Sequence, residues 1–289
     1  MPDRILITGA AGQLGSALCA ALESEYDLLR TDIATGPSAD IALDITSAHQ
    51  VDRLFSDHQP AVVINTAAFT DVDGNDREPE TAQKINLLGV EHLVGAAARS
   101  GARVIQISTD YVFDGSNGPY LETDPVNPQS VYGHTKLAAE KITLAQGKNL
   151  VIRTNVLFGP DLTARASFVR WVVESLQADE TIRVVDDQIN NPTLTIHMAD
   201  AIKIAVEREA AGLMHYGGLE FASRYQFARQ IGEHFQLPLD NILPIATVEL
   251  KQLAPRPLNG GLICSRMKME LGVENYNIRA ALQAAFPVN

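Results

Sequence analysis

Short apolar runs alternate with longer amphipathic stretches through the first half of the chain. The runs are almost wholly apolar, which is typical of parallel strands that helices cover on both faces. The stretches between them repeat apolar residues at the three-and-four spacing of crossover helices. This rhythm predicts an α/β fold of the Rossmann type, with a doubly wound parallel sheet. We expect strands at 4–8, 28–32, 61–65, 103–108 and 150–154, and helices at 13–24, 49–57, 80–100 and 131–145.

The second half of the chain follows a looser pattern. A helix is expected at 167–176, a strand at 181–185 and a loop at 186–192, and prolines break the last third into short elements. This predicts a smaller C-terminal substrate-binding lobe beside the sheet. We assign residues 1–157 and about 182–205 to a dinucleotide-binding domain, and 158–181 and 206–289 to the substrate-binding lobe.

The charge balance and the cysteines limit the partners and the location of the protein. A formal net charge of −12 opposes both nucleic acid and anionic membrane surfaces. No stretch approaches the roughly 18 apolar residues of a spanning helix, and the N-terminus shows no export leader. Cys19 and Cys264 lie far apart and favour free core thiols over a disulfide or a metal site. We therefore expect a cytoplasmic protein without nucleic-acid or membrane partners.

Three glycines spaced by three follow the first expected strand and open the first helix. Gly9 would permit a tight turn, Gly12 would let the backbone approach a pyrophosphate, and Gly15 would let helix and strand pack closely. Such triplets also occur in ordinary turns, so the strand and helix context carries the interpretation. We expect a dinucleotide to contact Gly9, Gly12, Gln13 and Leu14.

An acidic residue ends the second expected strand. Asp32 stands where a carboxylate hydrogen-bonds the adenosine ribose, and its charge would repel a 2′-phosphate, so NAD(H) is favoured and NADP(H) remains the alternative. A carboxylate that caps a turn is the other interpretation of Asp32. Asp44 and Ile45 are expected beside the adenine, and Ala67 and Ala68 at the carboxyl edge of the sheet, where small residues equally suit plain packing.

A tyrosine and a lysine lie four residues apart on the helix expected at 131–145. That spacing places Tyr132 and Lys136 on one helix face, and both are expected to reach the cofactor as well as the substrate. A cation at about 4 Å in an effective dielectric of about 20 is worth roughly 4 kcal/mol, so Lys136 is expected to lower the pKa of the phenol. Thr109 is expected to orient the substrate carbonyl, with Ser108 as the alternative, and His134 is expected on the surface.

Taken in order, these motifs resemble the extended short-chain dehydrogenase/reductase superfamily. Within it, the segments at 67–73, 108–115, 131–137, 187–193 and 256–257 resemble the dTDP-4-dehydrorhamnose reductases, which reduce the C4 ketone of a nucleotide-linked deoxysugar. The resemblance implies that Thr109, Tyr132 and Lys136 form the catalytic set. It also places five residues near the sugar or its nucleotide: Thr70, Asp71, Tyr111, Phe113 and Arg256. A guanidinium at position 256 would suit a diphosphate, although a surface arginine between prolines is the other interpretation.

Some positions separate this chain from its apparent relatives. Sugar-nucleotide dehydratases usually carry Thr-Asp-Glu, whereas Tyr111 follows Thr109 and Asp110 here, which favours a reductase. The segments 74–76 and 190–191 depart from the usual reductase pattern and leave the particular sugar open. Some relatives bridge a dimer through magnesium held by a glutamate after the last glycine, where this chain has Ser16 and Ala17. We therefore expect no metal, and any homodimer is expected to lack a metal bridge.

The sequence predicts an NAD(P)H-dependent reductase of a nucleotide-linked 4-keto-6-deoxysugar. Two alternatives stay open. The first is a non-catalytic nucleotide-binding regulatory subunit, because the methionine adenosyltransferase beta subunit resembles the same reductases. The second is another sugar-nucleotide enzyme, such as an epimerase that retains its cofactor through turnover.

Overall fold

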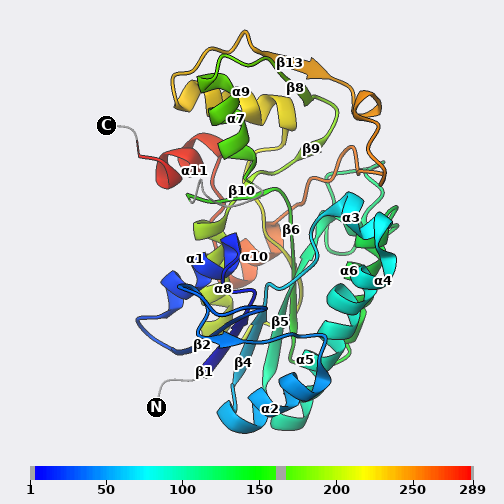
Figure 1. Cartoon of the computed structure of the whole chain (residues 1–289), viewed down its shortest axis with the longest axis vertical. Coiled ribbons are helices and arrows are strands. Elements are labelled where there is room, and N and C mark those ends of the chain that lie inside the picture. Colours follow the sequence, from blue (N-terminus) through cyan, green and yellow to red (C-terminus); the bar gives the residue numbers. More distant parts are fainter. Residues whose placement is uncertain (1–3, 161–166, 288–289) are drawn as a thin grey trace.

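The computed structural model describes residues 4–160 and 167–287. Residues 1–3, and residues 161–166 and 288–289 of the expected lobe, lie outside the described part. A seven-stranded parallel sheet forms the centre, in the order β11-β6-β5-β4-β1-β2-β3 (Figure 1). The strands are β1 Arg4–Thr8, β2 Asp27–Asp32, β3 Ile41–Ala42, β4 Val62–Asn65, β5 Arg103–Thr109, β6 Leu150–Thr154 and β11 Gly212–His215.

The strand order reverses beside β1, and this confirms the doubly wound expectation. From β1 the chain adds β2 and β3 on one side and then β4, β5, β6 and β11 on the other. All of these strands pair in parallel. Ligands of such sheets bind outside the carboxyl ends of the strands at the point of reversal, here between β1 and β4.

Helices cover both faces of the sheet because alternate strand residues point to opposite sides. Ile5 and Ile7 pack in one core with α1 and α8, whereas Leu6 packs in another core with α2 and α5. Figure 1 shows α1 and α8 on one side of the sheet and α5 and α6 on the other. The helices around the sheet are α1 Gln13–Leu22, α2 Ala48–His58, α3 Val72–Arg77, α4 Pro79–Gln83, α5 Gly89–Ser100, α6 Val131–Leu144, α8 Thr195–Glu207 and α10 Ser265–Leu271.

A second, smaller lobe lies beyond the carboxyl edge of the sheet (Figure 1). It has its own apolar core, which includes Val172 of α7, Phe227 of α9 and Leu282 of α11. Its helices are α7 Phe168–Gln177, α9 Arg224–His234 and α11 Ile278–Ala285. Its short strands pair as β8 Ile182–Val185 with β13 Ile242–Ile245 and β9 Ile189–Asn190 with β12 Ala222–Ser223, while β7 Leu157–Phe158 pairs with β10 Thr193–Leu194.

Several expected elements differ from the structure. The single helix expected at 80–100 is divided into α4, a π-helical turn at Lys84–Leu88, and α5. The turn carries the buried Asn86. Its side-chain oxygen accepts from the Phe69 backbone N–H at 2.8 Å, and its side-chain nitrogen donates to the Phe69 carbonyl at 3.2 Å. The loop expected at 186–192 contains the short strand β9. Helical periodicity did not predict the break because the apolar spacing continues across it.

Two strands pair with a strand of the other expected domain. β8 lies in the segment assigned to the dinucleotide-binding domain, yet it pairs with β13 of the lobe. β11 lies in the segment assigned to the lobe, yet it extends the main sheet beside β6. An apolar run indicates a buried strand but does not indicate which sheet the strand joins. The functional division into a cofactor domain and a substrate lobe stays a prediction.

Neither cysteine forms a disulfide. Cys19 is buried and Cys264 is partly buried, and both are free thiols as expected. Among the described residues, no helix is both long and apolar enough to cross a membrane.

Candidate functional site

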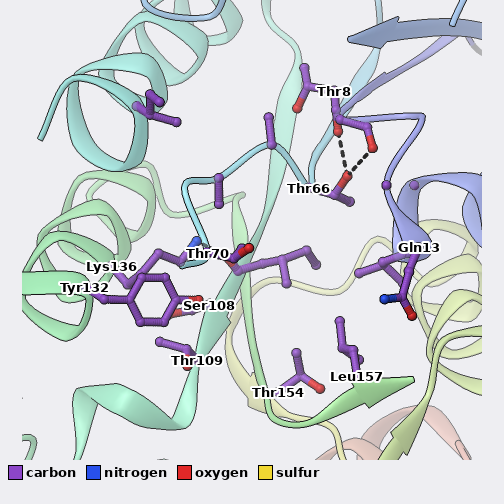
Figure 2. Close-up of a pocket in the computed structure, with 18 of the residues that line it drawn as sticks. Thr8, Gln13, Thr66, Thr70, Ser108, Thr109, Tyr132, Lys136, Thr154 and Leu157 are labelled. Carbon is purple, nitrogen blue, oxygen red and sulfur yellow. Dashed lines mark hydrogen bonds between the residues drawn. The ribbon is translucent and has the colours of Figure 1, made fainter. Parts of the chain in front are cut away.

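A cavity of about 730 Å³ opens at the carboxyl ends of the central strands, below the lobe. It is lined by the glycine turn after β1, by the ends of β2, β4, β5 and β6, and by the first turns of α6 and α9. Figure 2 shows Tyr132, Lys136, Thr109 and Thr70 gathered on one side of it, with Gln13 on the opposite side. The cavity therefore extends from the glycine turn at one end to a cluster of hydroxyl and ammonium groups at the other.

The glycine turn leaves no room for side chains. Gly9 has φ of 69°, a left-handed conformation that favours glycine. A Cβ at Gly15 would lie 2.1 Å from the Gly9 carbonyl oxygen. The Thr66 hydroxyl donates to the carbonyl of Thr8 at 2.6 Å and contacts that of Gly9 at 3.2 Å, and both contacts are drawn in Figure 2. The turn thus brings the N-terminus of α1 to the cavity, where it favours an anion.

The expected adenosine end lies on the same side as this turn. The Asp32 carboxylate accepts hydrogen bonds from the backbone N–H of Ala11 at 3.0 Å and of Ile33 at 2.7 Å. One Asp44 oxygen accepts from the backbone N–H of Thr46 at 2.9 Å and from its hydroxyl at 2.8 Å. All residues expected to bind the cofactor line this one cavity: Gly9, Gly12, Gln13, Leu14, Asp32, Asp44, Ile45, Ala67, Ala68, Tyr132 and Lys136.

Three buried polar atoms of the cavity residues lack a partner within the described part of the chain. They are Gln13 Oε1, Thr154 Oγ1 and Asn155 Oδ1. A buried acceptor without a donor is costly, so these atoms suit a ligand with amide or hydroxyl donors. The carboxamide of a nicotinamide is such a ligand, and the glycine turn fits its dinucleotide phosphates. Sequence reasoning did not name Thr154 or Asn155, although their position at the end of an expected strand could have indicated them.

The proton-transfer end is built from α6 and the end of β5. The Ser130 hydroxyl caps α6 by accepting from the Gly133 backbone N–H at 3.2 Å, and this fixes the first turn that carries Tyr132. Tyr132 is 9% exposed and its ring meets the ring of Tyr111 edge-on, with centroids 5.5 Å apart. The structure therefore brings Tyr132, Thr109 and Tyr111 together at the cavity wall, as expected.

Lys136 lines the cavity and is 4% exposed. Its Nζ donates to the Ile107 carbonyl at 2.7 Å. Burial lowers the pKa of the ammonium to about 8, although the charge of Glu140 acts to raise it. At neutral pH, Lys136 is therefore a cation whose pKa lies only slightly above the pH of the solution.

The phenol of Tyr132 differs from the expectation of an acidified group. Burial raises the pKa of Tyr132 above its usual value, and Asp110 and Tyr111 raise it further, whereas the Thr109 side chain lowers it. The Lys136 ammonium donates to the Ile107 carbonyl, and its charge does not offset the effect of burial on the phenol. Desolvation outweighs the expected charge effect, so Tyr132 stays protonated at neutral pH.

The structure distinguishes between the two hydroxyls after β5. Ser108 Oγ donates to Glu140 at 2.5 Å, and Glu140 forms a buried ion pair with Arg153 at 2.7 Å. Ser108 is thus engaged in a network under the sheet edge. Thr109 Oγ1 accepts from the Tyr111 backbone N–H at 3.2 Å and donates to Asp110 at 3.1 Å. Both hydroxyls thus have carboxylate partners, and Thr109 is favoured as the hydroxyl that meets a substrate because its side chain lies close enough to lower the pKa of Tyr132.

Asp110 is a buried carboxyl group at the cavity wall that sequence reasoning did not assign. Its side chain accepts from the Asn190 amide at 3.0 Å and from the Thr109 hydroxyl. Burial raises the pKa of Asp110 to about 7, against the lowering effects of Thr109, Arg224 and Asn190. The carboxyl group therefore changes its charge near neutral pH, next to the hydroxyl of Thr109.

The residues expected near the sugar divide into two groups. Thr70 and Tyr111 line the cavity. Asp71 does not line it, because its carboxylate caps α3 at Gly74 N and pairs with Arg77 at 3.1 Å. Phe113 is fully buried and stacks on Tyr120 at 4.0 Å between centroids, so it supports the fold under the site.

Arg256 also lies outside the cavity lining. It pairs with Asp73 at 2.9 Å and donates to the Ala254 carbonyl at 2.7 Å, so its charge is already neutralised by a carboxylate. His134 is exposed, as expected.

A doubly wound parallel sheet, a glycine turn followed by an acidic strand end, and a Tyr-x-x-x-Lys helix on one cavity define an extended short-chain dehydrogenase/reductase. The chain belongs to the family described as RmlD substrate binding domain, whose match spans residues 3–288.

Relatives cover nearly the whole chain. It is 34% identical over 295 residues to dTDP-4-dehydrorhamnose reductase of Aggregatibacter actinomycetemcomitans, covering 97% of each chain. The solved dTDP-4-dehydrorhamnose reductase of Bacillus anthracis, in complex with NADP, is similar with a TM-score of 0.91 and 30% identity over 99% of each chain. The chain is also 32% identical to the beta subunit of methionine adenosyltransferase 2 from Xenopus tropicalis, covering 92% of this chain and 81% of that one.

Proposed function

We propose that this chain is an NAD(P)H-dependent reductase that converts the C4 ketone of a nucleotide-linked 4-keto-6-deoxysugar to an alcohol, with a dTDP-linked sugar as the substrate. The observation that carries the proposal is the convergence of Thr109, Tyr132 and Lys136 on the cavity that the glycine turn enters. The relatives named as dTDP-4-dehydrorhamnose reductases support the choice of sugar and nucleotide.

The chemistry follows from the side chains at the reacting end. When bound in this cavity, a nicotinamide cofactor would provide the hydride for the ketone carbon. Tyr132 is protonated at neutral pH and donates its phenolic proton to the developing alkoxide, which is a stronger base than the phenolate. The Thr109 hydroxyl would turn from Asp110 to donate to the same oxygen and orient it. The Lys136 ammonium lines the same cavity and would hold the nicotinamide ribose beside Tyr132.

The residues fit a nicotinamide dinucleotide over the full length of the cavity. Gly12 and Gln13 at the start of α1 would hold the pyrophosphate, and the unpartnered acceptors Thr154 Oγ1 and Asn155 Oδ1 would meet the carboxamide. Asp32 would hold the adenosine ribose. We propose that NAD(H) is favoured over NADP(H), because a 2′-phosphate at that place would face the Asp32 carboxylate.

A non-catalytic regulatory subunit is the second candidate, favoured by the likeness to the methionine adenosyltransferase beta subunit. The proposed reductase role has the stronger support because the three catalytic candidates all lie at the cavity. The described residues contain no group of three His, Cys, Asp or Glu side chains suited to a metal. A homodimer without a metal bridge stays a prediction.

A substrate panel tests the proposed function. The protein is mixed with NADH or NADPH and with dTDP-, UDP- and GDP-linked 4-keto-6-deoxysugars, and the absorbance of the reduced cofactor is followed. We expect oxidation of the cofactor with the dTDP-linked ketone, faster with NADH than with NADPH. Absence of turnover with every ketone, together with capture of a partner enzyme in a pull-down, would favour the regulatory candidate.

A further inference from the structure

Arg224 is a cavity residue that none of the sequence motifs indicated. It is the first residue of α9, which begins at the cap Ser223, whose hydroxyl accepts from the Gln226 backbone N–H at 3.0 Å. The backbone N–H of Arg224 is held by the Gln188 carbonyl at 3.2 Å. Its guanidinium lies over the Phe168 ring, 5.4 Å from the centroid. The backbone of Arg224 and the charged end of its side chain are thus both held in place.

The guanidinium of Arg224 forms no ion pair or side-chain hydrogen bond with any residue in 4–160 or 167–287. The two other arginines near the site differ, because Arg153 pairs with Glu140 and Arg256 pairs with Asp73. Burial lowers the pKa of Arg224, and Tyr111 and Asp110 oppose this effect. A partly buried cation without a carboxylate partner is costly unless a ligand supplies the anion.

The surroundings of Arg224 indicate which anion it meets. Arg224 lines the same cavity as Asp110 and Tyr111, which contact the reacting groups Thr109 and Tyr132. The pyrophosphate of the cofactor belongs at the glycine turn, at the N-terminus of α1. In a pyranose ring C1 lies opposite C4. A sugar whose C4 oxygen faces Thr109 and Tyr132 therefore directs its C1 diphosphate away from them, toward the lobe that carries Arg224.

We propose that Arg224 binds the diphosphate of the nucleotide sugar through two parallel N–H donors, an inference that rests on the proposed function for the identity of the sugar. A planar guanidinium matches two phosphate oxygens at once, and Arg224 lines the cavity with its guanidinium over the Phe168 ring. Arg256 is already bound to Asp73 and lies outside the cavity lining, so its charge attracts the diphosphate less strongly than that of Arg224. Arg224 thus sets the preference for a diphosphate-linked sugar over a free one.

Binding of dTDP, measured by calorimetry in the presence of saturating NADH, tests this role without requiring turnover. NADH fills the cofactor site, so the nucleotide reports only the substrate end. The variants are Arg224→Gln and Arg224→Lys. The matched control is Arg229→Gln on the same helix, because Arg229 lies over the Tyr225 ring, 5.8 Å from the centroid, and outside the cavity lining. Thermal unfolding of each variant shows whether it remains folded.

Arg224→Gln is expected to weaken dTDP binding by about 10- to 100-fold, the range for loss of charge-assisted hydrogen bonds. Arg224→Lys should fall between the wild type and Arg224→Gln because it keeps the charge and loses the paired donors. Arg229→Gln should bind as the wild type does. Unchanged dTDP binding in folded Arg224→Gln, or no binding of dTDP by the wild type, overturns the inference. If dTDP binding depends on Arg224 but no keto sugar is reduced, the diphosphate site stands and the proposed reaction is the part that fails.

Discussion

At the scale of single residues, the local motifs indicated which side chains gather but not their electrostatics. Tyr132, Lys136 and Thr109 reach one cavity as their spacing predicted. The pKa of Tyr132 is nevertheless raised, because the burial that brings it to the site also desolvates it. Burial depends on neighbours far apart in the chain, such as Tyr111, which local spacing does not indicate. For the same reason, the sequence motifs did not indicate Arg224, which begins a helix of the lobe.

Asp110 provides a test of the site's electrostatics through stability. Its pKa is raised to about 7, so the native state keeps a proton that the unfolded chain releases near pH 4. The stability that this proton contributes is fully present below pH 4 and is lost as the pH rises through about 7. Above that, the native state must bury a carboxylate. Asp110→Asn is therefore expected to raise the free energy of unfolding relative to the wild type at pH 8, on the order of 2 kcal/mol, and not at pH 4.

Denaturant unfolding of both proteins at the two pH values measures this difference. Asp114→Asn is the control of opposite sign, because hydrogen bonds from Ser116 and Asn127 lower the pKa of Asp114 to about 2. The stability that Asp114 contributes is present above pH 4 and is lost as the pH falls through about 2, so its variant should be destabilised at pH 8. An Asp110→Asn effect that is the same at pH 4 and pH 8 would contradict the raised pKa.

At the scale of elements, the central strands and their crossover helices could be predicted closely from the sequence. β5 is one residue longer than expected and α6 ends one residue earlier. The failures occur where tertiary contacts override the local pattern. The π-helical turn Lys84–Leu88 accompanies the inward Asn86, and β8 joins β13 because both belong to the core of the lobe. The spacing of apolar residues in the sequence does not indicate either contact.

The packing of α1 against β1 predicts the effect of a single methyl group. Gly15→Ala places a Cβ 2.1 Å from the Gly9 carbonyl and 2.8 Å from Ala10 Cα, so the helix must move away from the turn. We expect a loss of about 1–3 kcal/mol in the free energy of unfolding, together with at least a tenfold loss in NADH affinity, as overpacking displaces the phosphate turn.

Gly147→Ala is the matched control for this variant, because its Cβ would meet no atom within 4 Å. Calorimetric titration with NADH and denaturant unfolding report the two effects. Wild-type NADH affinity in Gly15→Ala would show that the turn does not hold the cofactor.

At the scale of the whole molecule, buried amide side chains join the lobe to the sheet edge. Asn190 donates to Asp110 at 3.0 Å, and Asn155 contacts both Asn191 and the Gly260 carbonyl at 3.0 Å. The sequence showed the asparagine pair at 190–191 only as a departure from the usual reductase pattern. Its contacts show that it closes the site from the lobe side. The site therefore depends on segments far apart in the chain, which explains why local motifs predicted the cofactor end better than the sugar end.

Proton donation by Tyr132 is tested by a comparison of the wild type with Tyr132→Phe. Both are mixed with NADH and dTDP-linked 4-keto-6-deoxysugar, turnover is followed by the loss of reduced cofactor, and NADH binding is measured separately. We predict that Tyr132→Phe lowers turnover by about 10²- to 10⁴-fold while NADH binding is retained. Turnover near the wild-type rate in Tyr132→Phe would contradict the account.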